Sequence, residues 1–429
     1  MVCKLGQPGL RVLAELDPHQ TVSETNKGNN RYPAGGDPLP IDVRALPTFE
    51  VRLVPVLQQA NGLTGNVTAG NLESFLADLR QVLPVGDYDA DLRSVYTTTA
   101  PALQSGNGNN AWNTVLNELL ALRSAEASSR YYYGVVKVPY SSGVAGMGYV
   151  GGSARTAMGW DYLPSGSNVL AHEVGHNMGR MHAPCGSVGG ADPGYPHPGG
   201  TISAWGLHLG TLVLKSPTTP DVMGYCQPTW ISDYNWTAMM EYRMAGPNNT
   251  QAAPGRGEGL LVWGRIAPDR IVLEPAFRVP LAPGSAPVPG NHQLELLDSS
   301  GAVLRTVRFH APAIGDHSPE RHFAFVVPAE YGSLAVAGLR VRSGALQAAA
   351  QGLPPGDPEA SITRAGTDRI AVRWNAARYP MVLVRDAASG RVLSFARGGT
   401  ATLWSRAADV DLQFSSGART VSRRERLLR

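Results

Sequence analysis

The sequence is poor in cysteine, in charge and in long apolar runs. It has 3 cysteines among 429 residues, 17% charged residues and a formal net charge of +3. No stretch approaches the roughly 18 to 20 uninterrupted apolar residues that cross a bilayer, so we expect no membrane span. The lysines and arginines are scattered, which gives little support to a nucleic-acid partner, and we expect none.

The one dense basic run is the C-terminal tail. Residues 419–429 contain five arginines and a single glutamate. Such a run is typical of a solvated, frayed terminus, and that is the structure we expect for it.

The first 45 residues predict a small hairpin. Apolar and polar residues alternate over 10–14 as in a strand, Asp17-Pro18 indicates a turn, and Val22 marks a second short strand. The segment resembles the last hairpin of adhesion-like, immunoglobulin-fold modules in bacterial surface proteins. We therefore interpret residues 1–45 as the remnant of an upstream β module plus a linker, in a chain truncated at its N-terminus. Residues 1–18 lack the apolar core of a secretion signal.

Gly/Pro-rich breaks at residues 30–40, 245–259 and 351–360 divide the remainder. Between the first two, the pattern is mixed and predicts an α+β domain over residues 46–245. Strands are expected at 49–56 and 130–140, and helices at 71–85 and 111–127.

After residue 259 the pattern changes to short β runs separated by turns. It predicts a sandwich-like module over residues 259–350 and a smaller β module over 358–429. Similar hairpins, "LLDSSGAVL" and "LVRDAASGRVL", occur once in each. Tandem related domains and two unrelated hairpins with common turn chemistry both explain that similarity.

The stretch "VLAHEVGHNMGRMHAPCG", residues 169–186, contains the candidate metal-binding and catalytic residues. In a helix, His172 and His176 lie one turn apart on one face and can point two imidazoles at one ion, with Glu173 beside them. Gly179 can adopt positive φ, end the helix and bring His182 to the same ion. Surface histidines on an ordinary helix end are the alternative. Neutral imidazoles that hold Zn²⁺ beside an unligated carboxylate are the arrangement of zinc hydrolases.

Few residues other than His182 could supply the third metal ligand. Some zinc hydrolases take it from a later glutamate, but no glutamate lies between Glu173 and Glu241. His182 is therefore preferred, and His197 and His208 are distant alternatives that serve packing or surface roles.

These residues resemble the metzincin clan of zinc endopeptidases, whose signature is this helix with its glycine and third histidine. The clan also has a methionine turn beneath the metal, and "PDVMGYC" supplies Met223. The resemblance implies a twisted mixed sheet with a zinc helix and a Met-turn in residues 46–245. In the astacin and serralysin branches a tyrosine two residues later contacts the site, so Tyr225 is either an oxyanion stabiliser or a packed tyrosine. Ala183 departs from the best-known branches, so the subfamily stays open.

Two cysteines flank the motifs of this resemblance. If the Met-turn lies beneath the zinc, Cys185 and Cys226 come close together and a disulfide becomes plausible. A structural disulfide implies an oxidising compartment, so we expect a secreted, cell-surface or periplasmic protein. The alternative is Cys185 as a thiolate ligand. Cys3 is expected to stay unpaired.

Substrate binding in the clan uses an edge strand just before the zinc helix, to which an extended peptide adds antiparallel. "GVAGMGYVGG" occupies that position and supplies the candidate residues Gly146, Met147, Gly148 and Tyr149. A glycine-rich hairpin without a ligand is the alternative. Trp230 and Trp236 are candidates for the wall of a specificity pocket or for the core, and a closing helix is expected to begin near Ser232 or Asp233.

The resulting hypothesis is a secreted zinc endopeptidase, a monomer that uses Glu173 as general base and acts on polypeptides or glycoproteins. One alternative is a glycoprotein- or mucin-directed protease targeted by its β modules. Another is an adhesin-like binding protein with an inactive protease domain. Calcium binding in the loop around Asp192 is left open.

Overall fold

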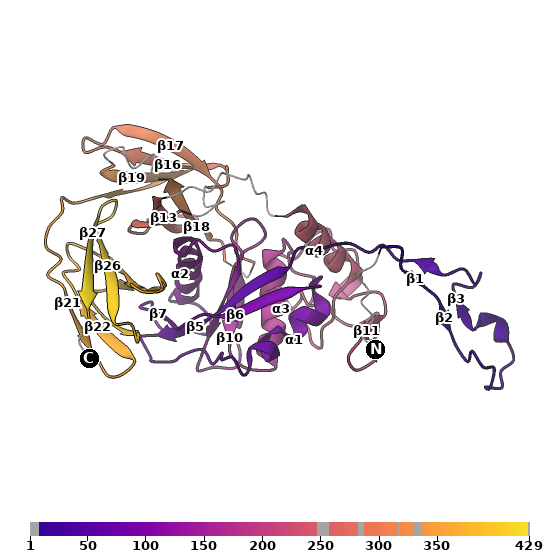
Figure 1. Cartoon of the computed structure of the whole chain (residues 1–429). Helices are drawn as coiled ribbons and strands as arrows, with labels where there is room; N and C mark the ends of the chain where they lie inside the picture. Colours follow the sequence, from indigo (N-terminus) through magenta and orange to yellow (C-terminus); the bar gives the residue numbers. More distant parts are fainter. Residues whose placement is uncertain (1–7, 247–256, 282–286, 316–317, 329–335, 428–429) are drawn as a thin grey trace. The chain divides into compact units, whose positions relative to one another are not determined.

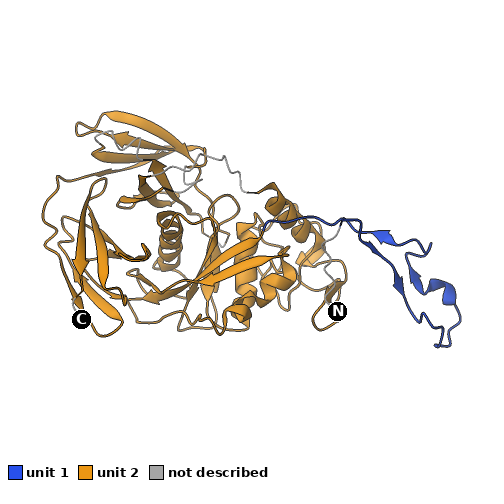
Figure 2. Cartoon of the chain, in the orientation of Figure 1, with its two compact units in different colours: residues 1–47 blue, residues 48–429 orange. Residues whose placement is uncertain are grey.

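The structure is a computed structural model of the chain, a mixed α+β, sheet-rich, multidomain protein. It describes residues 8–246, 257–281, 287–315, 318–328 and 336–427. Cys3 and the middle of the 245–259 break lie outside these residues. The chain divides into two compact units, residues 1–47 and residues 48–429 (Figure 2).

In residues 8–47, the described part of the first unit, the regular elements are short strands and one 3-10 helix. β1 (Arg11–Val12) pairs with β4 (Leu39–Pro40), β2 (Ala14–Glu15) pairs with β3 (Arg31–Tyr32), and the 3-10 helix spans Lys27–Asn29. The expected second strand at Val22 is wrong. The carboxylate of Asp17 accepts hydrogen bonds from the backbone N–H groups of Thr21 at 2.7 Å and Val22 at 2.9 Å, and so folds this segment into a loop.

The second unit is organised around one six-stranded sheet. Its strands are β5 (Phe49–Gln58), β6 (Tyr88–Leu92), β7 (Tyr96–Thr98), β8 (Tyr131–Val136), β9 (Gly146–Gly148) and β10 (Thr156–Trp160). The order is β6-β5-β8-β10-β9, and β7 also pairs with β5. All these pairings are parallel except that of β9, which lies antiparallel to β10 at the edge. The strands expected at 49–56 and 130–140 are confirmed as β5 and β8.

Helices cover both faces of this sheet (Figure 1). They are α1 (Leu72–Val82), α2 (Ala111–Ala125), α3 (Ser165–Asn177) and α4 (Asp233–Ala245). An apolar core lies on each face of the sheet, and the side chains of β8 point alternately into one and the other. Tyr131 and Tyr133 pack with α1 and α3, whereas Tyr132 packs with α2. The predicted helices at 71–85 and 111–127 are confirmed, and so is the closing helix, because the Ser232 hydroxyl caps α4.

After α4, the chain forms two sheets that pack on one shared apolar core. The first sheet contains β13 (Glu258–Ile266), β14 (Ile271–Leu273), β15 (Phe277–Pro280) and β18 (Arg321–Pro328). The second contains β16 (His292–Leu297), β17 (Val303–Phe309), β19 (Gly338–Ser343) and β20 (Leu346–Gln351). Phe325 of the first and Phe309 of the second meet with ring centroids 5.0 Å apart.

A second pair of sheets ends the chain. One has β21 (Ser361–Arg364), β22 (Arg369–Arg373) and β25 (Thr400–Trp404); the other has β23 (Met381–Asp386), β24 (Val392–Arg397), β26 (Asp409–Ser415) and β27 (Thr420–Arg426). The basic tail is therefore an edge strand, and its prediction as a frayed terminus is wrong up to Arg426. Arg424 forms a bidentate ion pair with Asp411 across the strand pair, which the sequence pattern of an exposed edge does not reveal.

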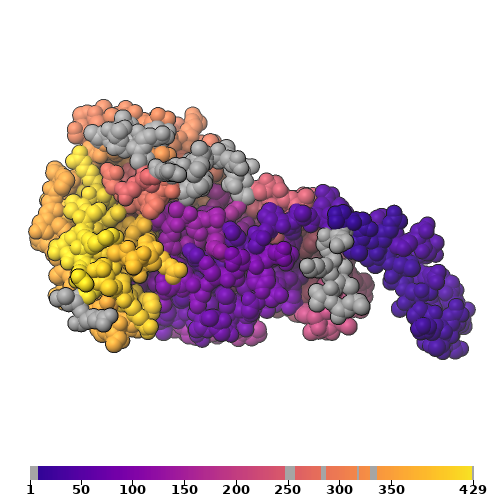
Figure 3. All heavy atoms as spheres, in the orientation of Figure 1, coloured from indigo at the N-terminus to yellow at the C-terminus, as the bar shows by residue number. Residues whose placement is uncertain are grey.

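Both pairs of sheets pack on α2. One core contains α2 together with Trp263 of β13 and Phe395 of β24, and in the space-filling view the orange and yellow atoms of these segments lie directly against the purple atoms of the sheet domain (Figure 3). Along β13, Trp263 faces α2 while Val262 faces the other sheet. Within the described residues, no helix is long and apolar enough to cross a membrane.

Candidate metal centre

Helix α3 and the bend after it carry the three histidines. His172 and His176 lie on the last two turns, and the helix ends at Asn177. Gly179 has φ of +85°, a value that a residue with Cβ adopts only with strain, and its N–H donates to the carbonyl of His176 at 2.8 Å. This bend returns the chain so that His182 faces the helix.

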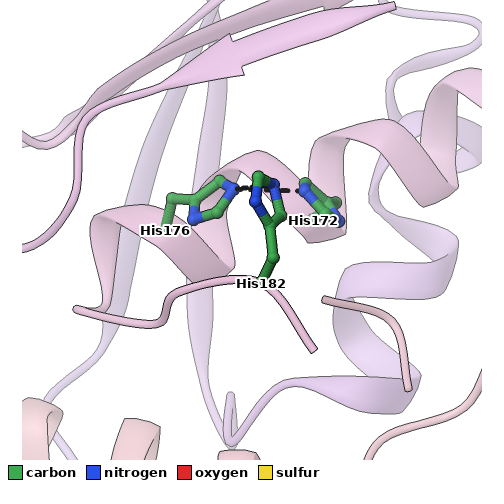
Figure 4. A group of neighbouring side chains, drawn as sticks. All are labelled: His172, His176 and His182. Carbon is green, nitrogen blue, oxygen red and sulfur yellow. Dashed lines mark hydrogen bonds between the residues drawn. The ribbon is translucent and has the colours of Figure 1, made fainter. Parts of the chain in front are cut away.

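The three imidazoles converge on one point (Figure 4). The Nε2 atom of His176 lies 3.1 Å from Nε2 of His172 and 3.2 Å from Nε2 of His182. The candidate ligand atoms all lie within 4.8 Å of one another, and all three residues are buried. No other group of this kind occurs in the part of the chain that the structure describes.

Backbone carbonyls fix the orientation of each ring. The Nδ1 atoms of His172, His176 and His182 lie 2.7, 2.6 and 2.6 Å from the carbonyl oxygens of Val222, Arg180 and Gly189. A carbonyl only accepts, so each Nδ1 must carry the proton and donate. Neutral rings of this tautomer present three Nε2 lone pairs to the common point, which is the arrangement that a metal ligand needs.

This donor set fits a tetrahedral zinc ion. With Zn–N bonds of about 2.0–2.1 Å and tetrahedral angles, two imidazole nitrogens would lie about 3.3 Å apart, close to the shorter separations observed here. Three converging lone pairs without a proton between them repel one another, so the geometry favours a cation at their centre. The cluster can hold a metal ion, and its chemistry suits zinc.

The turn that contains Met223 lies against this cluster. Asp221 is fully buried, and its carboxylate accepts from the N–H groups of Met223 at 2.7 Å and Ser232 at 2.8 Å. A Cβ at Gly175 of α3 would run into the sulfur of Met223, so the turn packs directly on the helix between the two histidines. Together with the Val222–His172 hydrogen bond, this packing holds the turn and the ligands in one rigid block.

The predicted disulfide is confirmed. Cys185 and Cys226 are bonded, with Cα atoms 5.7 Å apart, so the alternative of Cys185 as a thiolate ligand is wrong. The N–H of Tyr225 also donates to the carbonyl of Cys185 at 2.9 Å. The segment after the third histidine is thus joined both covalently and through the backbone to the Met223 turn.

The side chain of Glu173 projects from α3 towards the edge strand β9. Glu173 is 3% exposed and lines a cleft of about 1440 Å³. A Cβ at Gly146 would lie 2.5 Å from its Oε1 atom, and one at Gly148 would lie 2.7 Å from its backbone oxygen. The two glycines therefore allow the strand to run directly over α3.

Tyr225 and Trp230 also line the cleft. The ring of Tyr225 is 39% exposed and lies 5.0 Å from that of His182, centroid to centroid. Trp230 contributes to the wall, where Lys215 lies 5.6 Å from its ring. The structure thus brings Glu173, Tyr225 and Trp230 together with His172 in the lining of one cleft.

Other predicted residues lie elsewhere. Tyr149 is fully buried, and its hydroxyl is 2.7 Å from Nδ1 of His322 in β18, so its side chain is not part of the cleft. Trp236 lies on α4 outside the residues that line the cleft. His197 pairs with Asp233 at 2.9 Å. Asp192, the candidate for calcium, pairs with Arg180 at 3.0 Å.

Three features of the site were not expected from the sequence. Asp221 lies in "PDVMG", where an aspartate two residues before the methionine is a signal for a side-chain-bonded turn. Tyr133 of β8 lies near Glu173: burial raises the pKa of its hydroxyl well above the ordinary value, and the glutamate's negative charge adds to this. The cleft is also lined by Arg270 and Glu320 from beyond residue 259. No local pattern signals that contribution.

Comparison with known proteins gives little further information. No family model and no curated protein matches the chain. Among solved structures, metalloproteinase-II from Bacteroides fragilis is similar at 16% identity and a TM-score of 0.27 over 46% of this chain. A chaperone–substrate complex is similar at 11% identity and a TM-score of 0.26, also over 46% of this chain. The matches span 52% and 34% of those chains.

Proposed function

We propose that the chain is a zinc-dependent endopeptidase of the metzincin type. The observation that carries this proposal is the convergence of three Nε2 atoms whose rings are each fixed by an Nδ1–carbonyl hydrogen bond. His172, His176 and His182 would hold the ion. When bound, zinc supplies a Lewis acid that polarises a carbonyl and lowers the pKa of water.

The chain's own groups supply the rest of the reaction. Glu173 accepts the proton of the attacking water and returns it to the leaving amine, because it is the carboxylate that lines the cleft next to the histidines. The hydroxyl of Tyr225 donates a hydrogen bond to the oxyanion of the scissile carbonyl. An extended substrate would add antiparallel to β9, with Trp230 beside its side chains on the open side of the cleft.

The proposed site of action is outside the cell. The Cys185–Cys226 disulfide supports this, because such bonds persist in oxidising compartments. A preference for glycoproteins and a purely adhesive role both stay predictions.

Replacing the proposed base tests this function. Glu173→Ala should retain zinc, measured by metal analysis of the purified protein, and should lose casein hydrolysis by about 10²–10⁴-fold. The matched control is Glu73→Ala on the exposed side of α1, which should cleave like the wild type. Casein cleavage by zinc-loaded Glu173→Ala at the wild-type rate would refute the proposal.

A further inference from the structure

A segment of the first β module is paired with the edge of the catalytic sheet. The N–H of Gly315 donates to the carbonyl of Gly148 at 2.8 Å, and the N–H of Val150 donates to the carbonyl of Ala313 at 2.9 Å. Between these bonds, Tyr149 and Ile314 form an antiparallel bridge. We name residues Ala313–Gly315 the strap. It covers the backbone groups that continue β9 on the side away from β10.

The strap ends against a proposed metal ligand. A Cβ at Gly315 would lie 2.5–2.6 Å from three atoms of the His176 imidazole. The backbone of Gly315 is therefore packed on the ring, in a space where no side chain fits without displacement. The strap thus ends against one of the three proposed metal ligands.

Contacts on either side hold the strap in place. Ile314 is 6% exposed and belongs to the same apolar core as Met147 and Tyr149. Beyond the strap, the amide of Asn113 donates to the Ser318 hydroxyl at 3.1 Å, and the amide of Asn110 donates to Glu320 at 3.0 Å. Asn113 belongs to the first turn of α2 and Asn110 is its N-cap residue, so Ser318 and Glu320 are held at the start of α2. Asp316 and His317 lie outside the described residues.

The direction of the strap is that of a substrate. It runs antiparallel to β9 and approaches the histidines from Ala313 to Gly315. A substrate paired with the same edge in the same direction would place the residues N-terminal to its scissile bond there. The other half of the edge is open, because Gly146 and Met147 line the cleft.

We propose that the strap is an intramolecular competitor that occupies the N-terminal half of the peptide-binding edge, so that a peptide must displace it to bind across the metal centre. This inference rests on the proposed function. The competing substrate would carry a glycine next to the scissile bond, because Gly315 occupies a space against His176 in which no side chain fits without displacement. A tethered segment acts at an effective concentration in the millimolar range, so its release should strengthen peptide binding on the order of tenfold.

Binding to an inactive protein tests the strap without any hydrolysis. The probe is a fluorescein-labelled peptide with the sequence of residues 308–315, measured by fluorescence anisotropy against zinc-loaded Glu173→Ala protein. In this background, Gly315→Ala forces the strap away from His176, and Ser318→Ala removes an anchor without touching the histidine. Ser300→Ala, in the turn between β16 and β17, is the matched control.

We expect the peptide to bind about tenfold more tightly to the Gly315→Ala protein than to the parent. We also expect a smaller gain for Ser318→Ala and none for Ser300→Ala. Equal affinity for all four proteins would overturn the proposal. If Gly315→Ala loses zinc or fails to fold, Ser318→Ala decides, and the absence of any gain in that variant overturns it.

Kinetics separate this inference from the proposed function. In the active protein, Ser318→Ala should lower KM for peptides that extend N-terminal to the scissile bond and leave kcat unchanged. Peptides that extend only on the C-terminal side should show no change. A raised KM for the N-terminally extended peptides would mean that the strap helps to bind substrate, and would overturn the proposal. If no variant hydrolyses any peptide, the proposed function fails, while the binding measurement still tests the strap.

Discussion

The two faces of the catalytic sheet are built in different ways. On the face of α1 and α3, residues 172–226 provide the histidines, the carbonyls that orient them, the Met223 turn and the disulfide. On the face of α2, the contacts join residues some 300 positions apart, such as Arg93 and Val392. The first face is a local chemical unit, whereas the second depends on long-range burial. Each should therefore respond to different substitutions.

The buried charges of the α2 face should give the largest loss of stability. Arg397 pairs with Glu274 at 2.6 Å and Glu118 at 3.6 Å, and both carboxylates are at least nine-tenths buried. Arg397→Met leaves them without their cation and should lower the free energy of unfolding by about 3–5 kcal/mol in urea denaturation.

The control for this prediction is Arg424→Met. Arg424 pairs with Asp411 at the exposed edge strand β27, so the same change should cost less than about 1 kcal/mol. Equal losses for the two variants would mean that the α2 face does not depend on its buried charges.

Removing the disulfide tests how much the metal-centre face depends on its covalent link. The Cys185→Ser/Cys226→Ser double variant opens a link of 41 residues and should lower the free energy of unfolding by about 2–4 kcal/mol. The loss should be measured by thermal unfolding with and without a chelator. The chelator should lower the Tm of both proteins, and an unchanged Tm after the double substitution would contradict the proposed support.

Removing the hydroxyl of Tyr225 should lower activity without changing the stability of the fold. Tyr225→Phe removes the hydroxyl from an exposed ring beside His182 and should lower kcat by about 10²-fold on a peptide substrate, without changing zinc content or Tm. Tyr195→Phe, which removes a partly buried hydroxyl that donates to the carbonyl of Thr201, is the matched control. Unchanged kcat in Tyr225→Phe would assign that tyrosine to packing alone.

The smallest effect is a pH dependence on the α2 face. Burial alone would raise the pKa of Glu126, but the Arg93 guanidinium, paired at 2.5 Å, outweighs burial and lowers it. A lowered pKa in the folded state stabilises the fold above the ordinary glutamate pKa of about 4.3, and this stabilisation is lost as pH falls through the folded value. The stability gap between wild type and Glu126→Gln should therefore narrow below about pH 4. A gap that widens on acidification would contradict this assignment.

The same contrast explains what the sequence could predict. His172, Glu173, His176, Gly179 and His182 follow from helical periodicity and one bend, so their convergence is predictable from local spacing. The carbonyl partners and Asp221 depend on where the Met223 turn packs, which local spacing does not specify.

Two features depend on contacts that a local sequence pattern does not show. The tail over residues 419–429 shows no alternation because β27 is an exposed edge, so its pairing with β26 could not be predicted. Tyr149 stays a predicted residue of the peptide-binding edge, but its hydroxyl contacts His322, 173 positions away, and local spacing does not reveal that contact. The boundaries predicted at 46–245, 259–350 and 358–429 stay predictions. All three segments nevertheless contribute to the core around α2.

The most direct test of the account is the metal content of the folded protein. Wild-type protein purified without a chelator should contain one zinc ion per chain by plasma mass spectrometry, and His182→Ala should lose most of it while keeping the far-UV circular dichroism of the wild type. His197→Ala, which changes a histidine paired with Asp233 away from the cluster, should retain the ion. A correctly folded wild-type protein that binds no transition metal, even when zinc is supplied, would contradict the central claim.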